Sequence, residues 1–205
     1  MIPYMEELVQ HLKDVGVLKT PVLIEAFLKI DRRDFVPPEY QVQAYEDYPL
    51  PIGSGQTISQ PYTVAFMLEL LQPKKGEKIL DVGSGSAWTI ALLAHAVGRK
   101  GKVYGTEVIP SLVRFGQENL AKYQSLQGEI HQAKKGELGF QGKAPFDKIL
   151  VSAAGKEIPQ ELFPQLKEDG VMVLPVQDAV VRIQKKPGQR PHIQRFLGFV
   201  FVPLV

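Results

Sequence analysis

The sequence contains no cysteine, which excludes disulfide bonds, thiolate zinc sites and cysteine nucleophiles. Its four histidines are scattered and form neither an HxxxH nor an HxH pair, so we expect no metal site. No uninterrupted apolar run approaches the roughly 18 residues that a membrane-spanning helix needs. The first seven residues are too acidic and polar for a signal peptide. We therefore expect a cytoplasmic protein without metal or membrane contacts.

A large net charge is also absent. The 205 residues include 24 basic and 22 acidic side chains, for a net charge of +2, which is too balanced to indicate a nucleic-acid partner. One basic group follows Asp178, beyond which no acidic residue occurs: Arg182, Lys185, Lys186, Arg190 and Arg195. This group is either a site for an anionic partner or a solvated hairpin, and we favour the hairpin because turns collect lysine and arginine for solubility. We expect a monomer.

The composition is that of one globular domain. Hydrophobic residues make up 44% of the chain and charged residues 22%, and 205 residues are enough to bury a core. We expect a single domain over residues 1–205, with three parts. Residues 1–60 form an N-terminal segment that covers the substrate, residues 61–176 an α/β core that binds the cofactor, and residues 177–205 a C-terminal β-hairpin.

The N-terminal part is predicted to be helical at first and then irregular. Met5, Leu8, Val9 and Leu12 have helical spacing, and a second helix is expected to begin at Thr20-Pro21 with an apolar stripe of Leu23, Ile24, Phe27 and Leu28. Prolines and glycines interrupt every periodic pattern in residues 31–60. A long irregular stretch inside a compact domain is usually functional, which suggests a surface that covers substrate.

Strands and helices alternate in the core. The expected helices are residues 61–71, 90–94, 112–123 and 160–167, and the expected strands are residues 78–82, 102–106, 129–133, 146–151 and 171–174. Such alternation predicts a parallel sheet covered on both faces. Residues 180–184 and 195–201 flank a Pro-Gly turn and predict an antiparallel hairpin. The expected fold class is therefore α/β, with a seven-stranded, mostly parallel, Rossmann-like sheet.

A glycine turn marks the expected ligand site. Gly83-Ser84-Gly85 follows a strand and precedes a helix, where glycine lets a ligand approach the main chain. Glu107 ends the next strand, 22 residues beyond Gly85. Its carboxylate could accept two hydrogen bonds from a ribose diol, or it could be a solvated strand end.

Two cofactors use this arrangement, and two residues distinguish them. A dinucleotide site has a third glycine where this chain has Trp88, its only tryptophan, and a large indole there argues against a pyrophosphate. Asp81 would repel a pyrophosphate but suits the cationic S-adenosylmethionine. We therefore expect S-adenosylmethionine, with Asp81, Gly83, Ser84, Gly85, Glu107 and Val108 among the residues that bind it.

Three strings resemble the protein-L-isoaspartate O-methyltransferase family. They are Arg33-Asp34-Phe35-Val36-Pro37, residues 44–53 (AYEDYPLPIG) and Gly55-Gln56-Thr57-Ile58-Ser59-Gln60-Pro61. The likeness extends through the glycine turn, residues 144–147 and residues 201–204, and so covers nearly the whole chain. The predicted architecture is also similar to that of S-adenosylmethionine-dependent methyltransferases, in which a parallel sheet ends in an antiparallel pair of strands.

The resemblance implies a repair enzyme. Such enzymes methylate the free carboxylate of L-isoaspartyl residues in damaged proteins and release S-adenosyl-L-homocysteine; the ester then collapses to a succinimide. Ser59 matches the family's active-site serine, and Thr57 and Ile58 match positions whose backbone lines cofactor and substrate. Ser59 could instead cap the helix that begins at Pro61.

The chain departs from the family near the adenine. Where the family has Gly-Asp-Gly, an ungapped match gives Lys135, which cannot accept a hydrogen bond from an amine; a shift of two residues gives Glu137, which we favour. This departure leaves an alternative to the repair enzyme: a non-catalytic or divergent relative that binds isoaspartyl peptides or methylates another acceptor.

Overall fold

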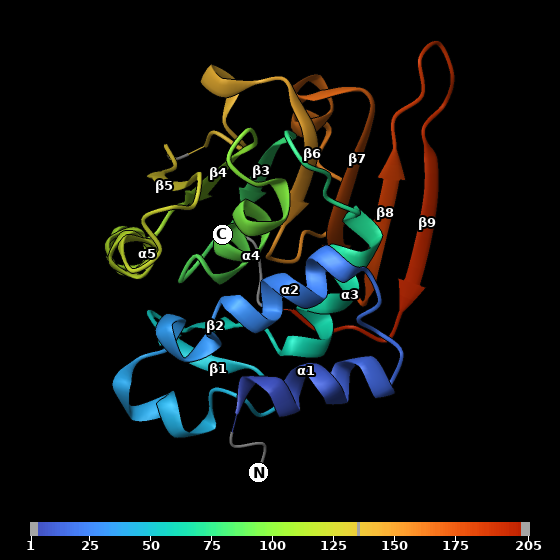
Figure 1. Ribbon diagram of the computed structural model, residues 1–205. Coiled ribbons are helices and arrows are strands. Elements are labelled where there is room, and N and C mark those ends of the chain that lie inside the picture. The colour runs from blue at the N-terminus through green and yellow to red at the C-terminus, as the bar shows by residue number, and fades with distance from the viewer. Residues whose placement is uncertain (1–3, 135, 202–205) are drawn as a thin grey trace.

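The computed structural model describes residues 4–134 and 136–201 and has an α/β fold (Figure 1). Within these residues one seven-stranded sheet has the order β5-β4-β3-β6-β7-β8-β9. The strands are β3 (Lys78–Val82), β4 (Lys102–Glu107), β5 (Gly128–Gln132), β6 (Phe146–Val151), β7 (Leu166–Val176), β8 (Ala179–Gln184) and β9 (His192–Leu197). The five strands from β5 to β7 run parallel, and β8 pairs antiparallel with both β7 and β9. The predicted fold class is confirmed.

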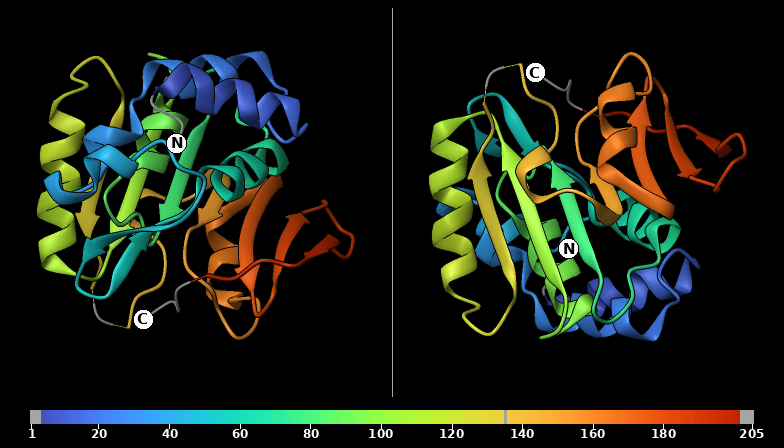
Figure 2. Two further views of the ribbon diagram at one scale, coloured as in Figure 1. Left: turned by 90° about the horizontal axis from the view of Figure 1, so that it is seen from below. Right: turned by 90° about the horizontal axis from the view of Figure 1, so that it is seen from above.

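The two faces of the sheet are covered differently. The α-helices are α1 (Met5–Asp14), α2 (Pro21–Lys29), α3 (Pro61–Leu71), α4 (Trp88–Val97) and α5 (Pro110–Ala121). Buried residues of all five belong to one apolar cluster with Ile79, Val103 and Ile130 of the sheet. Both views of Figure 2 place α5 along one edge of the sheet and β9 at the other. No helix in the described ranges is long and apolar enough to cross a membrane.

The opposite face has no α-helix among the described residues, which corrects the prediction of a helix over residues 160–167. A short 3₁₀-helix, η4 (Gln160–Gln165), lies there instead, and β7 begins at Leu166. Pro164 inside this segment removes a backbone donor, so a regular α-helix is disfavoured. A second 3₁₀-helix, η3 (Gln141–Lys143), precedes β6, and Leu162 of η4 packs in the cluster that covers this face.

The N-terminal helices form as predicted, with two differences. Thr20 precedes α2 and Pro21 starts it, but the Thr20 hydroxyl donates to Glu69 Oε2 at 2.7 Å and does not cap the helix. The buried stripe of α2 contains Leu23, Ala26 and Phe27, whereas Leu28 is 43% exposed. The predicted apolar stripe therefore included one residue, Leu28, that faces solvent.

Residues 31–60 are more ordered than predicted. They form two 3₁₀-helices, η1 (Arg32–Phe35) and η2 (Pro38–Gln43), and a two-stranded antiparallel hairpin of β1 (Leu50–Gly53) and β2 (Gln56–Ile58). Ser54 and Gly55 both have positive φ, of 54° and 72°, which is the backbone of a tight hairpin turn. The sequence prediction took the prolines as breaks in regular structure, but proline is compatible with 3₁₀-helices and with edge strands.

The C-terminal segment leaves the sheet earlier than predicted. β9 ends at Leu197, and Gly198 has a φ of 95°, a conformation that redirects the chain. The Phe199 ring then stacks on Phe66 of α3 with centroids 4.8 Å apart. This contact returns the last described residues to the neighbourhood of the β1–β2 hairpin.

Candidate functional site

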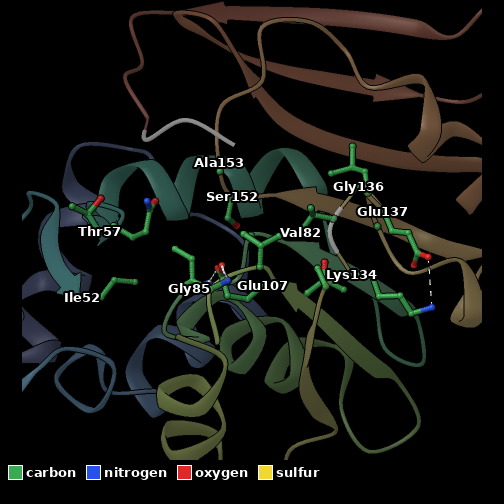
Figure 3. Close-up of a pocket in the computed structure, with 18 residues that line it drawn as sticks. Ile52, Thr57, Val82, Gly85, Glu107, Lys134, Gly136, Glu137, Ser152 and Ala153 are labelled. Atoms are coloured by element: carbon green, nitrogen blue, oxygen red, sulfur yellow. Dashed lines mark hydrogen bonds and ion pairs between the residues drawn. The ribbon is translucent and has the colours of Figure 1, made fainter. Parts of the chain in front are cut away.

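A cavity of about 330 Å³ lies at the carboxyl edge of the parallel strands (Figure 3). Five segments line it: the β1–β2 hairpin, the glycine turn after β3, residues 106–109 at the end of β4, the described residues of 133–139, and residues 152–153 after β6. Parallel strands in register bring their carboxyl ends to one edge, which is where ligands bind in such sheets. We call this space the main cavity.

The glycine turn forms one wall of the main cavity. Gly83 and Ser84 donate their amides to Thr106 O at 2.8 and 3.1 Å, which ties the turn to β4. Gly83 and Gly85 have φ values of 75° and 52°, and a Cβ at Gly85 would lie 2.9 Å from Ile52 Cδ1. The two glycines line the cavity and remain predicted cofactor residues, whereas the Ser84 hydroxyl turns inward and donates to Asp81 O at 2.9 Å.

Glu107 contributes a carboxylate to the main cavity. The residue is only 6% exposed, so the alternative of a solvated strand end is wrong. The Gly85 amide donates to Oε2 at 3.0 Å and the Ile109 amide to Oε1 at 2.9 Å. A carboxylate has about four acceptor positions, so two further hydrogen bonds remain available to a ligand. The backbone thus fixes the direction in which Glu107 accepts.

Asp81 lies behind the glycine turn and does not line the main cavity. It is fully buried, and its carboxylate accepts hydrogen bonds from Thr89 Oγ1 at 2.5 Å and Ser152 Oγ at 2.7 Å. Burial raises the pKa of Asp81 to about 6, against the opposing effect of these hydrogen bonds. Ser152 itself lines the cavity, so Asp81 reaches it through a side chain that the sequence prediction missed.

The 133–139 segment places Glu137 at the cavity rim. Its side chain is 62% exposed and pairs with Lys134 Nζ at 3.5 Å, and Figure 3 shows this pair on the side away from Thr57. Lys135, the other candidate for the adenine position, lies outside the described residues. Val108 lines the cavity and its carbonyl accepts from Gln132 Nε2 at 2.6 Å. Glu137 and Val108 therefore remain predicted ligand residues.

Ser59 lines two smaller spaces that adjoin the main cavity. A constriction of about 40 Å³ is lined by Thr57, Ile58, Ser59 and the glycine turn. An outer opening of about 250 Å³ is lined by Pro49, Thr57, Ser59, Gln60, Thr63, Val200 and Phe201. Thr57 borders all three spaces, so they adjoin. The predicted catalytic and cofactor residues, apart from the buried Asp81, therefore line one continuous region.

Ser59 does not cap α3, so the competing interpretation of this serine is wrong. The residue before the helix is Gln60, and the amide of Tyr62 is satisfied by Asp47 Oδ1 at 2.8 Å. Within the described residues the Ser59 hydroxyl makes no hydrogen bond, so it can donate to a ligand.

Trp88 lies beside the glycine turn but outside the main cavity. Its ring is buried at the start of α4, edge-to-face with Phe27 at 5.4 Å, and it borders the constriction and not the main cavity. The indole therefore anchors α2 to the core, and its argument against a pyrophosphate stays a prediction. Among the described residues no group of three or more His, Cys, Asp or Glu side chains could hold a metal ion.

Comparison with known proteins agrees with this geometry. The chain is 40% identical over 202 residues to the protein-L-isoaspartate O-methyltransferase of Pyrobaculum islandicum, covering 96% of this chain and 97% of the relative. It is 41% identical over 206 residues to that of Ignicoccus hospitalis, covering 97% and 96%.

A solved structure from Plasmodium falciparum, a protein-L-isoaspartate O-methyltransferase in complex with S-adenosyl-L-homocysteine, superposes with a TM-score of 0.85 at 25% identity and covers 98% of both chains. The family model for protein-L-isoaspartate(D-aspartate) O-methyltransferase matches residues 4–205. The chain therefore belongs to the protein-L-isoaspartate(D-aspartate) O-methyltransferase family.

Proposed function

We propose that this chain is a protein repair enzyme that transfers a methyl group from S-adenosyl-L-methionine to the free carboxylate of L-isoaspartyl residues. The observation that carries the proposal is the junction at Thr57, where a cavity holding the buried Glu107 carboxylate adjoins a constriction and opening that contain Ser59. The named activity of the relatives and the bound product in the Plasmodium structure support it.

The main cavity suits S-adenosylmethionine in size and chemistry. Its volume of about 330 Å³ falls in the range of small-molecule sites. Glu107 would accept from the ribose hydroxyls, the glycines would allow the ligand close to the main chain, and Ile109 and Leu138 offer apolar contact. S-adenosylmethionine supplies a methyl group made electrophilic by the sulfonium to which it is bonded. The buried Asp81 carboxylate, linked through Ser152, favours a cation at this place.

Ser59 and the constriction orient the acceptor. A carboxylate is ionised at neutral pH, since its reference pKa is about 3.9, so no general base is required. The Ser59 hydroxyl can donate to one carboxylate oxygen and direct the other toward the constriction. That passage is too small for a polypeptide, and the peptide chain must remain in the outer opening. Positioning of this kind can contribute roughly 7–11 kcal/mol to catalysis.

Transfer of labelled methyl groups tests the proposal directly. Incubation with labelled S-adenosylmethionine and an isoaspartyl peptide should yield a base-labile methyl ester, because the product is a carboxyl ester. The same peptide with a normal aspartyl residue is the matched control and should stay unlabelled. Absence of ester from the isoaspartyl peptide, or equal labelling of both peptides, would contradict the proposal. Calorimetry then identifies a non-catalytic relative, which would bind peptide but no cofactor.

Replacement of Glu107 tests the cofactor site. Glu107→Gln keeps the shape but loses the charge and offers one oxygen to the amides of Gly85 and Ile109. We expect the dissociation constant for S-adenosylmethionine to rise about tenfold, as for a lost charge-assisted hydrogen bond of 1–3 kcal/mol. Calorimetry measures it, with the exposed Glu118→Gln as control. Unchanged affinity would remove Glu107 from the ligand set.

We further propose that the enzyme acts as a cytoplasmic monomer, without a nucleic-acid partner. In the C-terminal basic group, Arg182 Nε donates to Leu70 O at 3.0 Å and Lys185 pairs with Glu168 at 2.7 Å. These intrachain partners support the interpretation of the basic group as part of a solvated hairpin.

A further inference from the structure

Arg32 is a fully buried cation next to the candidate active site. It lies in η1, is 0% exposed, and is among the largest side chains in the core. Its guanidinium donates to four main-chain carbonyls. Nη1 donates to Ala44 O at 2.8 Å and Glu46 O at 3.2 Å, and Nη2 to Tyr48 O at 3.0 Å and Ser59 O at 3.2 Å. The 44–48 loop is thus wrapped around one guanidinium that also holds the active-site serine.

This arrangement is costly for the stability of the fold. Burial lowers the pKa of Arg32 to about 9, and the nearby charge of Asp47 only partly offsets that effect, so the group stays charged at neutral pH. Its Nε is buried with no hydrogen-bond partner among the described residues. The guanidinium carbon lies 5.5 Å from the centre of the Trp88 ring. Apolar replacement of a buried charge often preserves stability, so stability alone does not account for Arg32.

The loop around Arg32 holds the Ser59 segment at two points. Arg32 binds the carbonyl of Ser59, and Asp47, in the middle of the same loop, accepts from the amide of Tyr62. Only Gln60 and Pro61 lie between these two attachments. Because Ser59 borders both the constriction and the outer opening, the two bonds set where its hydroxyl lies between them.

We infer that Arg32 is a positioning residue for methyl transfer, acting through Ser59. The inference rests on the proposed function. Arg32 lines neither the main cavity, the constriction nor the outer opening, so it does not touch the ligands. Its planar guanidinium can reach four carbonyls in two directions at once, whereas a lysine ammonium is a single point with three donors. The residue type therefore matters beyond its charge.

Arg32→Lys provides the test, with Arg33→Lys as the matched control because Arg33 is exposed in the same 3₁₀-helix. In the labelled-methyl assay we expect kcat to fall about tenfold for Arg32→Lys, since small misplacements of reacting groups have effects of this size or larger. The dissociation constant for S-adenosylmethionine should change by less than about twofold, because the main cavity is untouched. The control should match wild type in both.

A double mutant separates positioning from general damage. If Arg32 acts through the Ser59 hydroxyl, Arg32→Lys in a Ser59→Ala background should reduce kcat by no more than about twofold further. Independent, multiplying losses would overturn the inference, as would an equal loss of cofactor affinity and kcat. If Arg32→Lys does not fold, Asp47→Ala removes the other attachment. It should show the same selective loss of kcat, and a loss shared with cofactor affinity would overturn the inference.

The wild-type protein is assayed first. Lack of methyl transfer by the wild type contradicts the proposed function itself. Transfer by the wild type, together with an unselective loss in the variants, contradicts only the role of Arg32.

Discussion

Ser59→Ala should slow methyl transfer to an isoaspartyl peptide by about 100-fold and leave the affinity for S-adenosylmethionine nearly unchanged. The serine lines the constriction and the outer opening but not the main cavity. Its hydroxyl, which has no other hydrogen-bond partner in the described part of the chain, is the group available to hold the acceptor carboxylate. Loss of the hydroxyl leaves the carboxylate ionised but free to rotate away from the reacting direction.

Single-turnover rates and calorimetry on the same preparations measure the two effects. Ser125→Ala is the matched control because Ser125 is exposed in the turn between α5 and β5. Structural damage would lower both transfer and cofactor affinity in Ser59→Ala. An equal loss of the two would therefore show that Ser59 supports the fold of the loop and does not orient the acceptor.

The parts of the site that follow local rules could be predicted from the sequence. A strand, a glycine turn and a helix place Gly83 and Gly85 at the sheet edge, and an in-register neighbouring strand places Glu107 beside them. The catalytic role of Ser59 could be predicted only from the resemblance to a known family, since no periodicity or spacing distinguishes a single serine before Pro61. The sheet itself follows from apolar runs that alternate with helical patterns.

The missed residues make contacts that sequence patterns do not encode. The missed Arg32 is hydrogen-bonded to Ser59, 27 residues away in the sequence. The missed Ser152 is hydrogen-bonded to Asp81, 71 residues away. Ser152 could have been found as the first residue after the strand 146–151, at the edge where ligands bind. Arg32 carries no such signal, because an arginine beside Arg33 and Asp34 is indistinguishable from a solvated one until the chain has folded around it.

The predicted helix at residues 160–167 was wrong for a different reason. Its apolar positions Leu162 and Leu166 are buried as a helix would require, but Pro164 between them disfavours the α-helical backbone. The burial pattern there is that of a helix, but the proline determines the backbone conformation, which is a 3₁₀-helix. In residues 31–60 prolines led to the opposite error, because 3₁₀-helices and short edge strands accommodate them.

Asp81→Asn should stabilise the protein at pH 8 and weaken its hold on the cofactor. The folded pKa of Asp81, about 6, lies above its ordinary value of 3.8 because the group is buried. Folding therefore favours the protonated Asp81 side chain over the ionised one. The stabilisation of the folded state by this group is complete below about pH 4 and is lost as the pH rises through 6. Asparagine stays neutral, so the variant should gain up to about 3 kcal/mol over wild type at pH 8 and less at pH 4.5.

Urea unfolding at the two pH values measures this difference. Asp147→Asn is the control of opposite sign. Burial alone would raise the pKa of Asp147, but hydrogen bonds from Lys167 Nζ and the Lys78 amide lower it. Its stabilising effect is present above the ordinary pKa and lost as the pH falls, so Asp147→Asn should destabilise the protein at pH 8. An Asp81→Asn variant less stable than wild type at pH 8 would show that Thr89 and Ser152 need the charge as a partner.

Cofactor affinity should change in the opposite direction from stability. S-adenosylmethionine is cationic, and the ionised Asp81 lies directly behind the turn that the ligand would cover, linked to the cavity by Ser152. In wild type we expect affinity to fall about tenfold between pH 7.5 and pH 5 as Asp81 takes up a proton. Asp81→Asn should bind weakly at both pH values and show a flat profile. If the affinity for S-adenosylmethionine depends on pH in the same way in the variant and the wild type, the charge of Asp81 does not act on the cofactor. The buried carboxylate would then have a role other than cofactor binding.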